Sequence, residues 1–318
     1  MTTRTRLAGQ DRPAEAAVAG VAATRRPAAL AGLALAAVQT ARPRQWPKNL
    51  LVFAAPLAGA TLGRDDGFAY ALVAFAAFTA ASSAVYLIND VMDAERDRKH
   101  PTKQLRPVAA GRLPVPGALV LAAIGLTGAV GASLWIGEPW LAVVVGGYAV
   151  MSVLYSLWLK HVPGVELAFV ALGFVLRAVG GAVATHVPPS AWFLTVCTLG
   201  ALMVAIGKRY TELSVLGAEA AAEHRPVMRW YTLPLLRAAQ RTTTAIMFGA
   251  YLLWAAGEPD TWMRSWHLAS AVPLALALIR FDRLTVLAEG KPVEDLISKD
   301  PMIISSELTW LALFTIGL

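Results

Sequence analysis

The stretch YLINDVMDAERD, residues 86–97, decides the fold and the chemistry expected of this 318-residue chain. It ends an apolar run that begins near residue 67 and is long enough to cross a membrane as a helix. Spacings of three and four place Asn89, Asp93 and Asp97 on one helix face, with Asp90 beside them. Carboxylates gathered at a membrane edge repel one another, and Mg²⁺ relieves this while leaving positions for phosphate oxygens. The stretch therefore predicts a Mg²⁺ site for a phosphorylated substrate.

Basic residues and prolines follow directly. Lys103 and Arg106 are cations suited to phosphate, and Pro101 and Pro107 stop the helix. We expect this segment to fold back over the carboxylates. The alternative is a solvated helix end in which Asp and Arg side chains pair locally. The position of the string between a membrane span and a basic loop favours the metal site.

The composition predicts an integral membrane protein. Hydrophobic residues make up 57% of the chain and charged residues only 15%, too few for the surface of a soluble domain. The apolar runs are continuous rather than alternating, which indicates helices and not barrel strands. We therefore predict an all-α fold with nine transmembrane helices, at about residues 48–63, 67–89, 115–135, 139–159, 164–185, 190–209, 238–256, 265–281 and 302–318.

The first 40 residues differ from the rest. Residues 1–27 are rich in Ala, Arg and Pro and lack an apolar core, so we expect a disordered tail. The stretch 28–38 is apolar but too short to span, which favours an interfacial helix. This divides the chain into a tail, residues 1–40, and a transmembrane catalytic domain, residues 41–318. The one cysteine, Cys197, excludes a disulfide framework and a cysteine-based metal site.

The distribution of Lys and Arg predicts the orientation. The tail and three long loops, at about 90–114, 210–237 and 282–301, carry most of these residues, whereas the opposite side carries Arg64 and Arg264. Positive charge accumulates on the cytoplasmic side of the cell (inner) membrane. The Asp-rich helix end is thus expected to face the cytoplasm. The net charge of +7 then has a topological cause, so no nucleic-acid partner is expected.

At this point the sequence resembles the UbiA-type superfamily of intramembrane prenyltransferases, from about residue 40 onward. Asn89, Asp90, Asp93 and Asp97 match its N-D-x-x-D-x-x-x-D motif. The resemblance implies nine helices around a central cavity with a cytoplasmic cap, and Mg²⁺ bound to a diphosphate. Most of the superfamily has a second Asp motif near the end of span six. Here that place reads GKRYTEL, residues 207–213, which favours an anion site.

Three strings resemble one subgroup, the decaprenyl-phosphate phosphoribosyltransferases. They are RPRQWPKN at 42–49, HPTKQLRP at 100–107 and the GKRYTEL segment; a weaker fourth is EDLISKD at 294–300. The subgroup resemblance implies transfer of 5-phosphoribosyl from phosphoribosyl diphosphate to a polyprenyl (decaprenyl) phosphate. Diphosphate is released, and the product serves as a precursor for cell-wall arabinan.

The resemblance also implies roles for single residues. Asp90, Asp93 and Asp97 would be catalytic, and Asn89, Asp93 and Asp97 would hold the metal. The substrate-binding residues would be Lys48, Lys103, Arg106, Arg177, Lys208, Arg209, Tyr210 and Glu212. Lys103 and Arg106 suit the leaving group, whereas Lys208, Arg209 and Tyr210 suit either the 5-phosphate or the lipid phosphate.

Several positions have a second interpretation. Arg177, in the middle of a predicted span, either lines the cavity or forms a structural pair. Lys48 either binds phosphate or anchors the span at the interface. Asp295 and Asp300 either hold a second Mg²⁺ or cap the last loop.

Two other functions share part of the pattern. An aromatic prenyltransferase would use the same metal motif with a polyprenyl diphosphate, but the second Asp cluster is missing. A lipid transporter or flippase predicts polar residues at mid-depth in several spans, whereas the charges here crowd one face. The sequence is compatible with a homo-oligomer.

Overall fold

The computed structural model describes residues 31–318, apart from residue 65 and residues 288–292. The predicted disordered tail, residues 1–27, lies outside the described residues. A helix at Ala31–Ala41 follows, near the interfacial helix expected at 28–38. The described residues form helices and no strands, so the predicted all-α class is confirmed.

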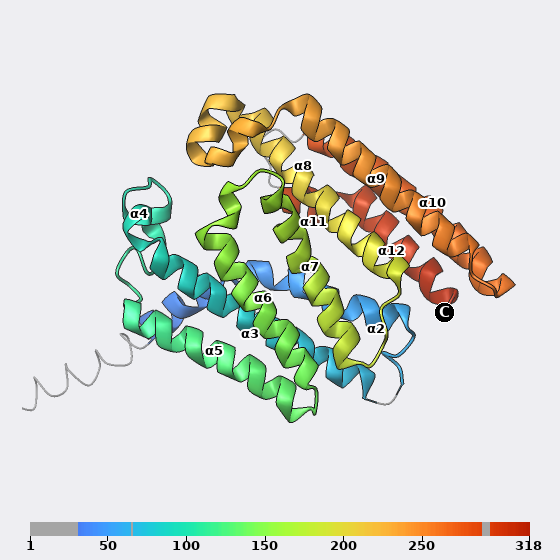
Figure 1. The fold of residues 1–318 in the computed structure, drawn as a ribbon, viewed down its shortest axis with the longest axis horizontal. Helices are drawn as coiled ribbons and strands as arrows, with labels where there is room; N and C mark the ends of the chain where they lie inside the picture. Colours follow the sequence, from blue (N-terminus) through green and yellow to red (C-terminus); the bar gives the residue numbers. More distant parts are fainter. Residues whose placement is uncertain (1–30, 65, 288–292) are drawn as a thin grey trace, which may run out of the picture.

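Long helices make up the body of the molecule, as Figure 1 shows. They are α3 (Gly67–Met92), α5 (Val115–Trp135), α6 (Pro139–Leu157), α7 (Val165–Ala184), α8 (Ala191–His224), α9 (Leu233–Ala256), α10 (Thr261–Val286) and α12 (Pro301–Ile316). The short helices are η1 (Pro43–Phe53), α2 (Ala54–Ala58), α4 (Ala94–Arg98), η2 (Lys103–Leu105), η3 (Leu159–His161), η4 (Pro226–Trp230) and α11 (Val293–Lys299), where η marks a 3₁₀ helix.

Five of the described helices are long and apolar enough to cross a membrane: α3, α5, α6, α7 and most of α8. Each coincides with a predicted span. The helices α9, α10 and α12 lie at three further predicted spans without meeting the same criterion. The helix α12 has only 16 residues, and polar residues such as Gln240 and Arg241 make α9 less apolar.

The predicted first span, residues 48–63, is not one continuous α-helix. It is replaced by η1 and the five-residue α2, with Pro47 inside the first and Pro56 inside the second. Each proline removes a backbone donor that a continuous helix needs. Here η1 packs so closely on α7 that a Cβ at Gly181 would overlap the backbone of Val52. Only glycine permits this approach.

The chain in α8 continues beyond its predicted span. It is interrupted at Gly217, whose φ of 75° lies in the left-handed region that favours glycine. The uninterrupted part carries the GKRYTEL segment, and after the break the chain turns into η4. Figure 1 shows that this turn and α4 extend from the same end of the bundle.

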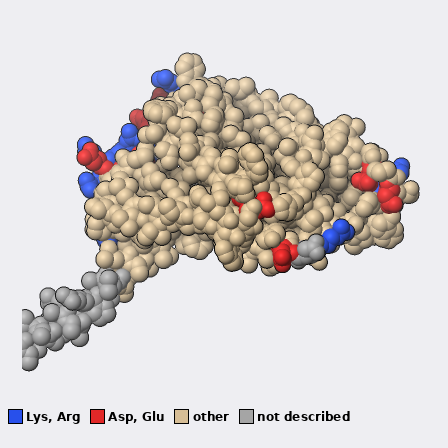
Figure 2. All heavy atoms as spheres, turned by 60° about the horizontal axis from the view of Figure 1, so that its bottom comes forward, with Lys and Arg blue, Asp and Glu red and all other residues tan. Residues whose placement is uncertain are grey.

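Small side chains allow the helices to approach closely. The buried face of α3 includes Ala74, Ala77 and Ala81, which is typical of helix interfaces within a membrane. Large apolar side chains such as Ile124 and Leu253 are instead exposed around the bundle. Figure 2 shows a face that is mostly uncharged, with charged residues at its left and right ends and a few near its centre and lower edge. This is the surface expected of a multi-pass membrane protein.

Candidate active site

The Asp-rich stretch lies where α3 ends and α4 continues its line. The Asp93 amide donates to the Asn89 carbonyl over 2.9 Å, and the Asp97 amide donates to the Asp93 carbonyl over 2.8 Å. The backbone thus keeps helical spacing between Asn89, Asp93 and Asp97. Asp90 and Asp97 are 2% and 3% exposed, whereas Asp93 is only half-buried.

Two arginines neutralise the buried carboxylates. Arg106 Nη1 lies 2.7 Å from Asp97 Oδ2 and 3.4 Å from Asp90 Oδ1. Arg42 Nη2 lies 2.5 Å from the same Asp90 oxygen, and its guanidinium stacks 4.7 Å over the Tyr86 ring. The loop after α4 therefore folds back over the helix end, as its prolines predicted. Charge counting assigned Arg42 only to topology, although the RPRQWPKN string contains it.

Oxygens suited to Mg²⁺ remain at this helix end. Asn89 Oδ1 is buried and accepts no hydrogen bond, and no ion pair involves Asp93 within the described part of the chain. Among the described residues no three His, Cys, Asp or Glu side chains converge, and Arg106 binds both Asp90 and Asp97. Mg²⁺ needs only one or two protein carboxylates when phosphate completes its shell, so this donor set fits the ion.

The GKRYTEL segment of α8 contains a buried ion pair. Arg209, 4% exposed, donates to both oxygens of the fully buried Glu166 on α7, each over 2.8 Å. It also donates to Glu212 Oε2 over 2.8 Å. Arg225 approaches the Glu166 and Glu212 carboxylates at 3.8 and 3.9 Å, and Tyr231 lies 3.5 Å from Glu166. Arg209 thus joins α7 to α8.

Sequence reasoning missed Glu166 as the partner of Arg209, because the two residues are 43 positions apart. The other expected binding residues of the segment lie close by. Lys208 is exposed on α8, and Tyr210 is half-buried with the Arg237 guanidinium 5.7 Å from its ring centre. Lys103 is half-buried at the start of η2, and Lys48 is half-buried on η1.

Arg177 has a set of neutral partners. It is 6% exposed and donates to Asn49 Oδ1, Gly173 O and Tyr148 Oη over 2.7, 2.7 and 2.8 Å. Asn49 in turn donates to Thr79 on α3 over 3.0 Å. Arg177 therefore ties η1 and α6 to α7, and it places Asn49, which follows Lys48, against α3.

The Asp-rich end of α3 and α4 and the ion network of α8 lie on the same side of the molecule. Burial and the positive charges of Lys160, Arg96 and Arg225 lower the pKa of His161, which ends η3. Arg96 belongs to α4 and Arg225 to the ion network of α8. α4 and the ion network of α8 therefore lie at the same end of the molecule, on either side of His161.

The EDLISKD string, residues 294–300, contains two aspartates, Asp295 and Asp300, for which a metal site and a capping role were both considered. The side chain of Asp295 lies outside the described residues. Asp300 accepts hydrogen bonds from the Met302 and Ile303 amides, each over 3.1 Å, and its carboxylate pairs with Arg280 at 2.8 Å. The Arg280 hydrogen bond holds the pKa of Asp300 below its usual value. These contacts match the capping interpretation.

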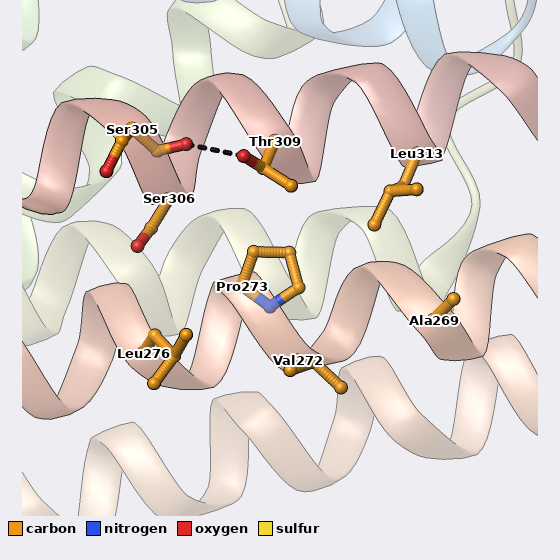
Figure 3. Close-up of a pocket in the computed structure, with 8 residues that line it drawn as sticks. All are labelled: Ala269, Val272, Pro273, Leu276, Ser305, Ser306, Thr309 and Leu313. Atoms are coloured by element: carbon orange, nitrogen blue, oxygen red, sulfur yellow. Dashed lines mark hydrogen bonds between the residues drawn. The ribbon is translucent and has the colours of Figure 1, made fainter.

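A pocket in the described part of the chain lies away from these polar groups. It has a volume of about 450 Å³ and lies between α10 and α12, as Figure 3 shows. Its lining is mostly apolar, with hydroxyls from Ser305, Ser306 and Thr309. It contains no carboxylate or cation, so it lacks the chemistry expected of a phosphate site.

The chain was compared with known proteins. The model of the UbiA prenyltransferase family matches residues 48–295. The decaprenyl-phosphate phosphoribosyltransferase of Mycobacterium tuberculosis is 40% identical over 296 residues, which are 90% of this chain and 95% of that protein. The protein of the same name from Corynebacterium glutamicum is 35% identical over 281 residues, 86% of this chain and 83% of that protein.

A solved structure has the same fold. A UbiA homolog from Archaeoglobus fulgidus, bound to GPP and Mg²⁺, superposes with a TM-score of 0.65 at 14% identity. The match covers 89% of this chain and 98% of that one. Family model, sequence relatives and fold agree, and the chain belongs to the UbiA prenyltransferase family.

Proposed function

We propose that this chain transfers 5-phosphoribosyl from phosphoribosyl diphosphate to a polyprenyl phosphate and releases diphosphate. The observation that carries the proposal is its 35–40% identity, over most of its length, to transferases named decaprenyl-phosphate phosphoribosyltransferase. The residues agree in kind, because carboxylates gather at the end of α3 and cations on α8.

The end of α3 is the proposed place of the diphosphate. Asn89, Asp93 and Asp97 would hold Mg²⁺, which would stabilise the charge that develops on the departing diphosphate. Asp90 holds Arg106 beside Asp97, so a fixed positive charge faces the same leaving group. Lys103, at the start of η2, would add a second one.

The reaction needs little proton transfer. An oxygen of the lipid phosphate forms a bond to C1 of the ribose while the bond from C1 to the diphosphate oxygen breaks. The diphosphate leaves with the electron pair. A phosphate monoester has its second pKa at about 6 and is ionised near neutral pH, so the protein need not supply a base.

The segment on α8 is the proposed place of the other phosphate. Lys208 and Tyr210 would bind either the 5-phosphate of the donor or the phosphate of the acceptor. Arg209 binds both Glu212 and Glu166, so we assign these residues to the packing of α7 on α8. Lys48 and the Arg177–Asn49 pair would approach the same space from η1 and α7.

The proposal includes the finer topology. Nine spans, with α4, η2, η3 and η4 forming a cap on the cytoplasmic side, agree with the common end from which these elements extend (Figure 1). The concentration of Lys and Arg at this end supports the orientation.

The test supplies purified enzyme with labelled phosphoribosyl diphosphate, a polyprenyl phosphate and Mg²⁺. We expect label in the lipid fraction and release of diphosphate, both lost when Mg²⁺ is chelated. A parallel reaction contains an aromatic acid and a polyprenyl diphosphate. Prenylation of the acid without any labelled lipid would replace the proposal with an aromatic prenyltransferase.

A further inference from the structure

A second groove lies between α9 and α10 and has a volume of about 320 Å³. Its floor is apolar and its rim is polar. The floor consists of Ala245, Phe248, Ala275, Leu278 and Ile279, and the rim of Arg241, Thr244, Asp282 and Arg283. One end of the groove therefore suits a charged group and the rest suits a hydrocarbon chain.

The rim has an excess of positive charge. Asp282 pairs most closely with Arg237, at 2.6 Å, and more distantly with Arg241, at 3.8 Å. Arg283 is exposed, and no ion pair involves it within the described residues. Asp282 is thus shared between Arg237 and Arg241, while Arg283 adds a further positive charge to the rim. An anion placed between Arg241 and Arg283 would balance this charge.

The groove opens on the outer surface of the bundle. Ile279 on its floor is 53% exposed, and α9 and α10 lie along the edge of the molecule in Figure 1. This surface faces hydrocarbon in a multi-pass protein. Basic pockets between transmembrane helices at the charged end of the spans bind anionic lipid head groups.

We propose that this groove binds an anionic phospholipid from the leaflet on the Arg-rich side of the membrane. Its phosphate lies between Arg241 and Arg283, and one acyl chain covers the apolar floor. A guanidinium suits this role because it binds phosphate oxygens through two N–H groups at once. The site lies on a different flank from the Asp-rich end of α3, since α3 packs on α5, α6 and α7 while α9 packs on α8 and α10.

The groove also contacts the segment of α8 through one residue. Arg237 binds Asp282 and lies over the ring of Tyr210. A phosphate that binds Arg241 leaves Asp282 to Arg237 alone. The bound lipid therefore stabilises the packing of α8, α9 and α10, and it should raise the unfolding temperature.

The experiment uses the full-length protein in detergent, with native mass spectrometry and thermal unfolding during titration of phosphatidylglycerol. Phosphatidylcholine is the neutral control. We expect one tight phosphatidylglycerol adduct and a matching rise in the unfolding temperature. The double variant R241Q/R283Q should weaken this adduct about 25-fold, because each arginine near an anionic lipid contributes a factor of about five.

Two further variants separate the groove from charge in general. A245W fills the groove while keeping both arginines, and it should also abolish the tight adduct. R229Q removes an exposed arginine of η4 outside the groove and should leave the adduct unchanged. Equal binding of phosphatidylglycerol and phosphatidylcholine, or a tight adduct that survives both groove variants, would overturn the proposal.

A polyprenyl phosphate arm tests the source of the lipid. If polyprenyl phosphate displaces phosphatidylglycerol and the groove variants raise the acceptor KM, the groove belongs to the acceptor and the phospholipid proposal fails. The adducts, the unfolding temperature and the displacement of phosphatidylglycerol are binding measurements, so they do not depend on whether phosphoribosyl transfer is the correct reaction.

Discussion

Arg209 and Glu166 form a bidentate ion pair, with both oxygens of the carboxylate 2.8 Å from the guanidinium, between two helices of the bundle. Removing one partner of a buried pair leaves an uncompensated charge, whereas replacing both with apolar residues is often neutral. Arg209 belongs to the GKRYTEL segment, which stands where most of the superfamily has its second Asp motif, whereas Glu166 lies on α7. The Arg209 guanidinium could therefore stabilise the contact of α7 with α8 or bind a substrate phosphate.

A single and a double substitution separate a structural role of this ion pair from a role in substrate binding. We expect E166Q to destabilise the fold, by less than the roughly 3–5 kcal/mol of a fully broken buried pair because Arg209 keeps its hydrogen bond to Glu212. The double variant E166L/R209M should recover most of the unfolding temperature, and turnover should recover with it because Arg209 already donates to two carboxylates. Thermal unfolding and turnover are measured on the same samples. Recovered stability without turnover would contradict this prediction and assign the guanidinium to a substrate phosphate.

The carboxylates of α3 and α4 should respond differently to amide substitution. Asp93 makes no ion pair within the described residues, so D93N should lower kcat by roughly 10²–10³, a typical loss of transition-state stabilisation, without changing the unfolding temperature. D97N should lower both kcat and the unfolding temperature, because it leaves Arg106 without its closest partner. The Mg²⁺ concentration for half-maximal activity should rise in D93N.

Glu95 provides the control for this pair of variants. It is an exposed carboxylate on α4 between the two aspartates, so E95Q changes the local charge equally. We expect normal activity and stability. Full activity in D93N, or an E95Q defect as large as that of D93N, would move the metal away from this helix face.

The sequence was sufficient for the parts of the fold that depend on local pattern. Apolar length predicted α3, α5, α6 and α7 within a few residues of their ends, because a membrane helix satisfies its own backbone. The division of the first predicted span into η1 and α2 was not predicted, because it depends on Pro47, Pro56 and a tertiary contact at Gly181. No local pattern contains that contact.

The same reason explains what was missed at the site. The i, i+4 spacing of Asn89, Asp93 and Asp97 is local and is present in the structure. Arg209 and Glu166 are 43 positions apart, and Arg42 and Asp90 are 48 apart. Composition could count these charges but could not pair them. Motif strings flagged Arg42 and Arg209 without showing that each has a carboxylate partner.

Arg177 should contribute to stability through its neutral hydrogen bonds. Y148F removes one partner and should cost about 1 kcal/mol, whereas R177M also leaves Asn49 Oδ1 without its donor and should cost about 1–3 kcal/mol more. Chemical or thermal unfolding measures this order. R177K keeps the charge but cannot reach all three acceptors at once, so it should fall between them. An R177M protein as stable as wild type yet unable to bind phosphoribosyl diphosphate would instead place this side chain in the cavity.

The orientation can be tested with single cysteines. In a C197S background, E219C lies beyond the break in α8 and T261C begins α10 at the opposite end, and both residues are exposed. Lys and Arg concentrate on the cytoplasmic side, so a membrane-impermeant maleimide should label T261C in intact spheroplasts and E219C only after permeabilisation. The background protein controls for labelling elsewhere. The reverse pattern would place the Asp-rich end of α3 outside the cytoplasm, away from a phosphorylated sugar donor made inside the cell.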